Sequence, residues 1–303
     1  MISSSSPHNQ QYMDLLGLQD GSGIPVEELE YDDGNDGNDE LQLKNETMLN
    51  IHPYIAIFML SFVGGFVDAA LFVSLFGLFT ASVTGNLISI VAIGERERIS
   101  RFTVTATFFG GAAFSSVVTN CAKACGAKKQ KTIAVILLLI EATALIILSI
   151  AGWILKEDII KLKDVDAPLS LSLGTIAAFA MGLQNGLCRE CFSTFPQSTV
   201  LTSTLVAEAQ HLVDFAFRKK TITVMGQSRF LYNLCPLVAF LSGAVLASFL
   251  IKTEAGYLCL LLPAFLIAVL ALDVVSVLIF DTRRSSKELK ASLISIHSLS
   301  EIL

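Results

Sequence analysis

Three carboxylates lie inside long apolar stretches of the sequence: Asp68, Glu141 and Asp273. A charged side chain at the centre of a bilayer costs roughly 2.5–3.5 kcal/mol on insertion scales, so such residues usually face a bundle interior and mark functional sites. A carboxyl group in apolar surroundings favours its neutral form, which suits proton coupling but equally suits a side chain that bonds a neighbouring helix. We predict Glu141, near the middle of its segment, and Asp273, nearer to an end, as proton-coupling residues.

Asp68 completes a stripe of small and polar residues, because Ser61, Gly65 and Asp68 are spaced i, i+4 and i+7. In the second half of the chain Asn185 takes the equivalent place, beside a second amide, Gln184. The stripe predicts a close helix contact with a carboxylate on one side and amides on the other. Asp68 is then part of a solute-binding site, a buried structural hydrogen-bonding group, or the cap of a broken helix.

Two clusters of small polar residues, Thr84-Gly85-Asn86 and Thr202-Ser203-Thr204, lie within apolar surroundings. A glycine there permits an unwound turn whose backbone can contact a ligand, as in broken transporter helices, although a tight packing point between helices is the alternative. The predicted solute-binding residues are Asp68, Thr84, Gly85, Asn86, Gln184, Asn185, Thr202 and Ser203.

Two other groups of polar residues are weaker candidates for a functional site. Glu208, His211 and Asp214 share one helical face, which fits a carboxylate–imidazole proton relay, a metal site or a solvated helix end. The pair Cys188-x-x-Cys191 lacks the second pair or the histidine that a zinc site needs. We therefore predict no metal, no cofactor and no enzymatic activity, and the chain has no phosphate-binding loop and no nucleic-acid signature.

The elements that must position these residues are membrane helices. Hydrophobic residues make up 53% of the chain and charged residues 16%, against roughly a quarter charged in soluble domains. Apolar segments of about the length needed to cross a bilayer recur along the chain. They lie near 54–76, 78–94, 102–120, 132–154, 169–187, 198–217, 230–251 and 256–280. Segments 78–94 and 198–217 contain polar residues and are each a full span, a broken helix or a re-entrant piece.

The chain repeats itself. The pattern Phe108-x-x-Gly111-Ala112 recurs as Phe240-x-x-Gly243-Ala244, 132 residues later. The same offset aligns Glu141 with Asp273 in the sequence. An offset of 117 residues places Gly65-x-x-Asp68 on Gly182-x-x-Asn185. We predict an all-α, polytopic bundle of 6–8 spans, built from two repeated four-segment halves. Internal repeats of this kind are typical of transporters.

Charge placement predicts the topology. If all eight segments cross the membrane, Lys and Arg divide 15 to 6 between the two sides, and if the two doubtful segments are re-entrant they divide 14 to 7. Both schemes place the termini on the basic, cytoplasmic side, and neither decides between parallel and inverted halves. The predicted parts are a disordered acidic tail (1–50), a first repeat (51–155), a connecting loop (156–168), a second repeat (169–280) and a C-terminal tail (281–303), which is an interfacial helix or a frayed end.

Three blocks of the sequence resemble the hallmark motifs of the YoaK-like membrane proteins. They are Gly64-Gly65-Phe66-Val67-Asp68-Ala69, Phe79-Thr80-Ala81-Ser82-Val83-Thr84-Gly85-Asn86 and Ala178-Phe179-Ala180-Met181-Gly182-Leu183-Gln184-Asn185-Gly186. The resemblance covers roughly residues 54–280 and implies a membrane fold. Because that family is a domain of unknown function, it implies no activity. The acidic tail and the C-terminal extension depart from the compact bacterial pattern.

These features favour a secondary transporter or permease for an unidentified small solute or ion, with a polar site between the halves at mid-membrane. The alternative is a membrane scaffold or assembly factor, in which buried polar groups only join helices and the acidic tail recruits a protein partner. An intramembrane enzyme has less support. The bilayer is the one partner that the sequence requires, and a homo-oligomer is left open.

Overall fold

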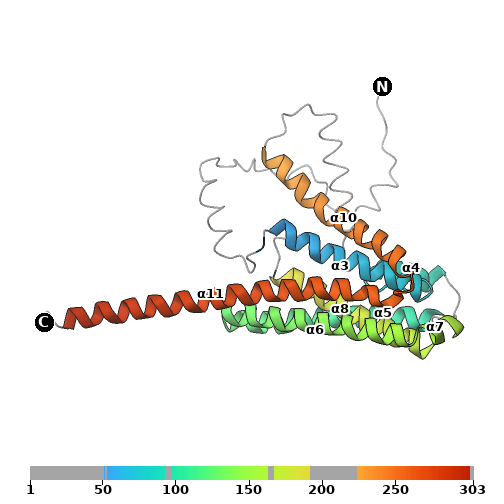
Figure 1. Cartoon of the computed structure of the whole chain (residues 1–303), viewed down its shortest axis with the longest axis horizontal. Helices are drawn as coiled ribbons and strands as arrows, with labels where there is room; N and C mark the ends of the chain where they lie inside the picture. The colour runs from blue at the N-terminus through green and yellow to red at the C-terminus, as the bar shows by residue number, and fades with distance from the viewer. Residues whose placement is uncertain (1–50, 52, 93–96, 163–166, 192–223, 301–303) are drawn as a thin grey trace, which may run out of the picture. The chain divides into compact units, whose positions relative to one another are not determined.

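The computed structural model describes residues 51, 53–92, 97–162, 167–191 and 224–300 (Figure 1). Every regular element among these residues is helical. Five of the helices are long and apolar enough to cross a bilayer: Ile55–Ser74, Arg98–Ala124, Ala127–Ile154, Pro168–Cys191 and Gly256–Arg284. The predicted multi-pass helical fold is confirmed. The acidic tail and the segment 198–217, with Thr202 and Ser203, lie outside the described residues.

The first half contains α3 (Pro53–Ser74), α4 (Val83–Ala92), α5 (Arg98–Ala124) and α6 (Ala127–Ile154). Helix α3 begins with a proline, whose fixed φ suits the first turn. It is followed by Phe76 and Gly77, which both have positive φ and turn the chain out of the helix. Helices α5 and α6 form a hairpin joined at Gly126, where φ is +110°.

Helix α4 has ten residues and is therefore about 15 Å long, half of the roughly 30 Å that a span must cross. The described part of the predicted segment 78–94 is thus too short for a full span. It consists of a non-helical turn followed by a short helix, which was one of the alternatives that the sequence left open.

The second half contains α8 (Pro168–Cys191), α10 (Val224–Leu250), the 3-10 turn η2 (Gly256–Leu260) and α11 (Leu261–Ser300). Two boundaries differ from prediction. The connecting loop holds a short helix, α7 (Lys156–Leu162), because Leu155 and Lys156 continue almost directly from α6. Helix α11 runs unbroken for 40 residues, past the predicted boundary at 280, so the C-terminal segment continues the last span rather than starting a separate element (Figure 1).

Helices α5 and α8 cross at two glycines, without side chains between the backbones. A Cβ atom at Gly182 would collide with the carbonyl oxygen of Phe108, and one at Gly111 would collide with the carbonyl oxygen of Phe179. Gly186, one turn further along α8, meets Ala112, one turn further along α5, so the two helices run parallel.

Helices α3 and α10 cross in the same manner. A Cβ at Gly65 would collide with the carbonyl oxygen of Phe240, and one at Gly243 would collide with that of Phe62. Small residues allow this close approach, in which van der Waals contact replaces the hydrophobic effect that lipid does not supply.

Helices α6 and α11 pack along each other in opposite directions (Figure 1). Lys131, near the start of α6, pairs with Asp281 late in α11. Ser149, near the end of α6, donates to the carbonyl of Tyr257 in η2, just before α11 begins. Large apolar side chains remain exposed around the bundle, among them Val91 at 83%, Phe249 at 70% and Phe280 at 68%. Such a surface is suited to lipid rather than water.

Candidate functional site

The turn between α3 and α4, residues 75–82, is where residues of the first two motif blocks meet. Its backbone is not helical and is partly buried, so its polar atoms need hydrogen-bond partners from elsewhere in the protein. Side chains from α3, α4 and α5 supply them, namely Asp68, Asn86 and Arg101.

Asp68 binds the far side of this turn with both carboxylate oxygens. Its Oδ1 accepts hydrogen bonds from the backbone N–H groups of Thr80 at 2.7 Å and Ala81 at 2.8 Å, and from the Thr80 hydroxyl at 3.3 Å. Its Oδ2 accepts from the Ser82 hydroxyl. The side chain is 5% exposed. These contacts match the alternative in which Asp68 is a buried hydrogen-bonding group at a broken helix, and its part in solute binding stays a prediction.

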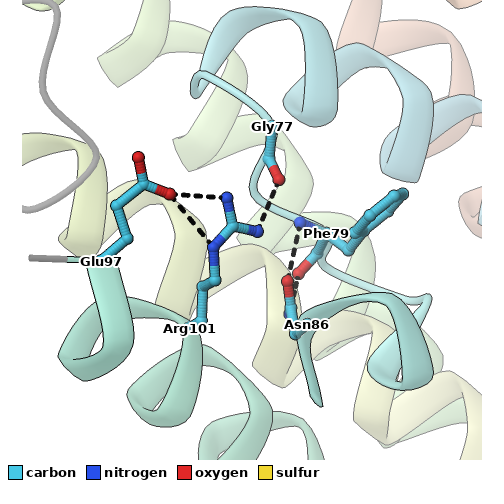
Figure 2. A network of polar contacts seen from close by, with 5 residues as sticks. All are labelled: Gly77, Phe79, Asn86, Glu97 and Arg101. Atoms are coloured by element: carbon cyan, nitrogen blue, oxygen red, sulfur yellow. Dashed lines mark hydrogen bonds and ion pairs between the residues drawn. The ribbon is translucent and has the colours of Figure 1, made fainter. Parts of the chain in front are cut away.

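Asn86 binds the middle of the same turn in both directions. Its Nδ2 donates to the carbonyl of Phe79 at 2.6 Å, and its Oδ1 accepts from the N–H of Phe79 at 3.2 Å (Figure 2). Gly85 lies against the Phe79 ring, which a Cβ would strike. Thr84, the third member of the predicted cluster, is exposed. The cluster therefore has one buried polar side chain, Asn86, and one exposed polar side chain, Thr84.

Arg101 holds the near end of the turn. Its guanidinium donates through Nη1 to the carbonyl of Gly77 at 2.8 Å, and through Nη2 and Nε to one oxygen of Glu97 at 2.8 and 3.2 Å (Figure 2). The residue is 3% exposed. From the sequence, Arg101 was only one of the Lys and Arg charges that divide between the two sides of the membrane. The available signal was a basic residue placed at the very start of an apolar segment, where burial without a partner would be costly.

The amides predicted on α8 lie apart from this turn. Gln184 is 1% exposed and donates from Nε2 to the carbonyl of Leu60 on α3 at 2.7 Å, which joins the two halves. Leu60 precedes Asp68 by eight residues, about 12 Å along the helix. Asn185 is half-buried. The structure therefore brings Asp68, Gly85 and Asn86 together and places Gln184 about two helical turns away.

Glu141 lies on the buried stripe of α6. The stripe includes Leu137, Leu138, Ala142 and Leu145, spaced so that they share one helical face with Glu141. Glu141 is 0% exposed, and neither of its carboxyl oxygens has a hydrogen-bond partner among the described residues. It does not bond a neighbouring helix there, unlike the structural alternative that the sequence left open.

Asp273, the second predicted proton-coupling residue, has different surroundings. It is half-buried on α11, and its Oδ2 accepts a hydrogen bond from the backbone N–H of Ile51 at 3.2 Å. The two carboxyl groups that the offset of 132 residues relates are thus unequal in this conformation. Glu141 is fully buried without a hydrogen-bond partner among the residues that the structure describes, whereas Asp273 is half-buried and hydrogen-bonded.

No group of three His, Cys, Asp or Glu side chains with metal-binding geometry occurs among the described residues. Glu208, His211 and Asp214 fall outside them. Cys188 is buried and Cys191 is half-buried, both as free thiols. These observations leave the polar turn of Asp68, Asn86 and Arg101 and the sealed carboxyl of Glu141 as the candidate site.

Comparison with known proteins gives one match. Residues 56–272 match the family described as "Protein of unknown function (DUF1275)". The match confirms the resemblance to an uncharacterised membrane family that the three motif blocks predicted. No curated protein and no solved structure matches the chain.

Proposed function

We propose that this chain, which belongs to the DUF1275 family of proteins of unknown function, is a secondary transporter for a small solute. In this proposal it consists of two inverted repeats, and protons couple through Glu141. One observation carries the proposal: the helix crossing between α5 and α8 and the crossing between α3 and α10 use equivalent residues of the two halves.

Each residue of one crossing has a counterpart at the sequence offset of 117 or 132 residues. The counterparts are Gly65 and Gly182, Phe62 and Phe179, Phe108 and Phe240, and Gly111 and Gly243. Gly65 meets Phe240, and the counterpart of this contact is the one between Gly182 and Phe108. Gly243 meets Phe62, and the counterpart is the contact between Gly111 and Phe179. A two-fold relation between the halves accounts for both pairs at once.

The direction of the helices favours inverted rather than parallel halves. Helix α6 runs antiparallel to α11, its counterpart in the other half. Helices α5 and α10 each reverse direction into α6 and α11 through short connections, so α5 and α10 are antiparallel as well. Inverted repeats of this kind place the two-fold axis in the membrane plane. They are a common basis for alternating access in secondary transporters, which also use broken helices at the site.

A six-span topology follows within this proposal, with α4 as a short non-spanning helix and α10, of 27 residues, as a span. It corresponds to the charge division of 14 to 7 and places both termini on the basic, cytoplasmic side. With three spans in each half, the two halves would cross the membrane in opposite orientations, in agreement with the antiparallel packing of α6 and α11.

Glu141 is the coupling residue in this mechanism. Its counterpart Asp273 accepts a hydrogen bond from the N–H of Ile51. At the offset of 117 residues, Ile51 corresponds to Pro168, which has no N–H to donate. Glu141 therefore lacks the donor that its counterpart has. A buried carboxyl without a partner is costly for structure, and a group that must take up and release a proton explains its presence better than a structural role does.

Asp68, Asn86 and Arg101 are positioning residues in this proposal, since they hold the turn between α3 and α4. Gln184, which bridges to α3, and its neighbour Asn185 are the amides placed where the halves meet. With Thr84 and Gly85 on α4, and with Thr202 and Ser203 beyond the described residues, they remain the proposed solute contacts.

One observation favours the scaffold alternative. Asp68, Asn86, Arg101 and Gln184 all bind the protein's own backbone, which is also what groups that only join helices would do. A transport assay separates the two readings, because a scaffold moves neither solute nor proton.

The test uses the full chain in liposomes that contain a pH-sensitive dye, with the membrane potential clamped. Amino acids, carboxylates, nucleosides and inorganic anions are added in turn. We expect at least one of them to drive proton flux, and Glu141→Gln to reduce that flux at least tenfold while Glu254→Gln, which alters an exposed carboxylate, leaves it unchanged. Folded wild-type protein that moves no proton with any of these solutes would favour the scaffold. Proton flux that persists in Glu141→Gln would remove Glu141 from the mechanism.

A further inference from the structure

The described basic side chains gather at one end of the helix bundle. The α5–α6 hairpin places Lys123, Lys128, Lys129 and Lys131 there, and α8 and α11 add Arg189, Arg283 and Arg284. Two contacts show that these segments meet: Lys131 pairs with Asp281 of α11 at 2.6 Å, and Gln130 donates to the carbonyl of Glu190 at the end of α8 at 3.5 Å. At this end the described side chains thus include seven basic groups and two acidic ones, Glu190 and Asp281.

The opposite end is balanced. Its described side chains are four basic ones, Arg98, Arg101, Lys156 and Lys252, and four acidic ones, Glu97, Glu157, Asp158 and Glu254. Arg101 is moreover buried and engaged with Glu97. The excess positive charge is therefore a property of one end, brought together by the fold from three separate parts of the sequence.

A notch of about 170 Å³ lies between α6 and α11 at this basic end. Lys128, Lys131, Asp281 and Thr282 line it together with Ala127 and Leu278. Lys131 and Asp281 cross it as an ion pair, with side chains 16% and 53% exposed. The notch also adjoins the first turn of α6, where the opening amide groups of a helix have no partner within the helix.

The notch lies at the level of lipid headgroups. On α6 the polar residues end at Lys131 and the apolar run begins directly after Thr132, and on α11 the apolar run ends at Phe280, directly before Asp281. Because these two transitions lie side by side, the boundary of the hydrocarbon layer passes at the mouth of the notch. A phosphate group at this level belongs to a phospholipid rather than to a free solute.

We propose that the notch between α6 and α11 binds the phosphorylated headgroup of an anionic phospholipid, held by Lys128, Lys131 and the basic side chains around them. The headgroup competes with Asp281 for Lys131. Clusters of basic residues next to a membrane span attract anionic headgroups, and ammonium groups pair with phosphate oxygens through charge-assisted hydrogen bonds. This binding is independent of transport, since it needs only the charged end of the bundle.

The test measures binding of fluorescent, short-chain phosphatidylinositol bisphosphate to the full chain in a neutral detergent. We expect saturable binding, no comparable binding of the matching phosphatidylcholine, and no displacement by an equal concentration of inorganic phosphate. Lys128→Gln combined with Lys129→Gln weakens the affinity on the order of 25-fold, because each lysine near an anionic headgroup contributes roughly fivefold.

Two further variants sharpen the test. Lys156→Gln with Lys252→Gln removes the same charge from the opposite end and should bind as the wild type does. Asp281→Asn releases Lys131 and should tighten binding several-fold, where a variant that merely disturbed the fold would loosen it. Equal affinity of wild type and Lys128→Gln/Lys129→Gln, equal binding of phosphatidylcholine, or full displacement by inorganic phosphate would overturn the proposal. Unchanged unfolding temperatures verify that each variant is folded.

Discussion

Asp68, Asn86 and Arg101 come from three helices, and each binds backbone atoms of the single turn between α3 and α4. The reason is burial. A buried, non-helical turn is stable only when the protein itself supplies hydrogen-bond partners for its backbone N–H and C=O groups. The Asp68 carboxylate accepts hydrogen bonds from the N–H groups of Thr80 and Ala81. The Asn86 amide both donates to the backbone carbonyl of Phe79 and accepts from its N–H group. The Arg101 guanidinium donates to the carbonyl of Gly77.

A substitution at Asp68 tests this role at the scale of one residue. Asp68→Asn removes the negative charge and turns one acceptor into a donor that faces other donors. We expect it to lower the free energy of unfolding by about 2–3 kcal/mol, as for hydrogen bonds to a charged group. Asp281→Asn, at an exposed ion pair, should cost less than about 1 kcal/mol. Unfolding titrations in mixed detergent micelles measure both, and equal stability of the two variants would contradict the assignment.

At the scale of elements, the bundle depends on two close helix crossings. In each, glycines let one backbone rest on the carbonyl groups of another, and an added methyl group would have to push the helices apart. Backbone does not yield as a flexible side chain does, so the strain cannot be relieved locally. The crossings also join the halves, because α3 packs with α10 and α5 with α8.

Two adjacent glycines of α5 provide a matched test of the crossing. Gly111→Ala places its Cβ against the Phe179 carbonyl, whereas the Cβ of Gly110→Ala has no atom within 4 Å. We expect Gly111→Ala to destabilise the protein by about 1–3 kcal/mol. Gly110→Ala should be neutral or more stable by up to about 1 kcal/mol, because alanine favours the helix. Thermal unfolding in detergent compares the stability of the two variants. A similar loss of stability in both would mean that the close approach of the helices at Gly111 does not determine the stability of the bundle.

At the scale of the whole molecule, the proposed six-span topology depends on α4 being too short to cross the membrane. With α4 and its counterpart segment not spanning, three spans (α6, α8 and α10) separate the α5–α6 hairpin from the loop after α10. An odd number of spans puts those two connections on opposite sides of the bilayer. If eight segments crossed instead, the two connections would lie on the same side.

Thiol labelling separates these topologies. Cys125 is exposed in the α5–α6 hairpin, and Glu254→Cys would add an exposed thiol after α10. In sealed vesicles of one orientation, we expect a membrane-impermeant maleimide to modify only one of the two, and to modify both after the membrane is permeabilised. Mass spectrometry of the peptides identifies the site. Labelling of both thiols from the same side of sealed vesicles would support eight spans and argue against inverted halves.

The sequence by itself determined the membrane class, the positions of five long apolar helices and two of the three residues that hold the polar turn, Asp68 and Asn86. Hydropathy and helical period are local properties, and a run of apolar residues has few alternatives to a span. Motif blocks pointed to Asp68, Gly85 and Asn86, and the repeated spacing pointed to the glycines of the crossings.

Tertiary structure alone decided what those residues touch. Asp68 finds its partners 12 to 14 residues away in the turn, and Arg101 reaches back 24 residues to Gly77. Glu141 is fully buried and has no hydrogen-bond partner in the part of the chain that the structure describes. The basic residues of three segments become one surface only when α6, α8 and α11 come together. Such pairings depend on how helices pack across long separations in the chain, and neither composition nor spacing encodes which side chain a folded helix will meet.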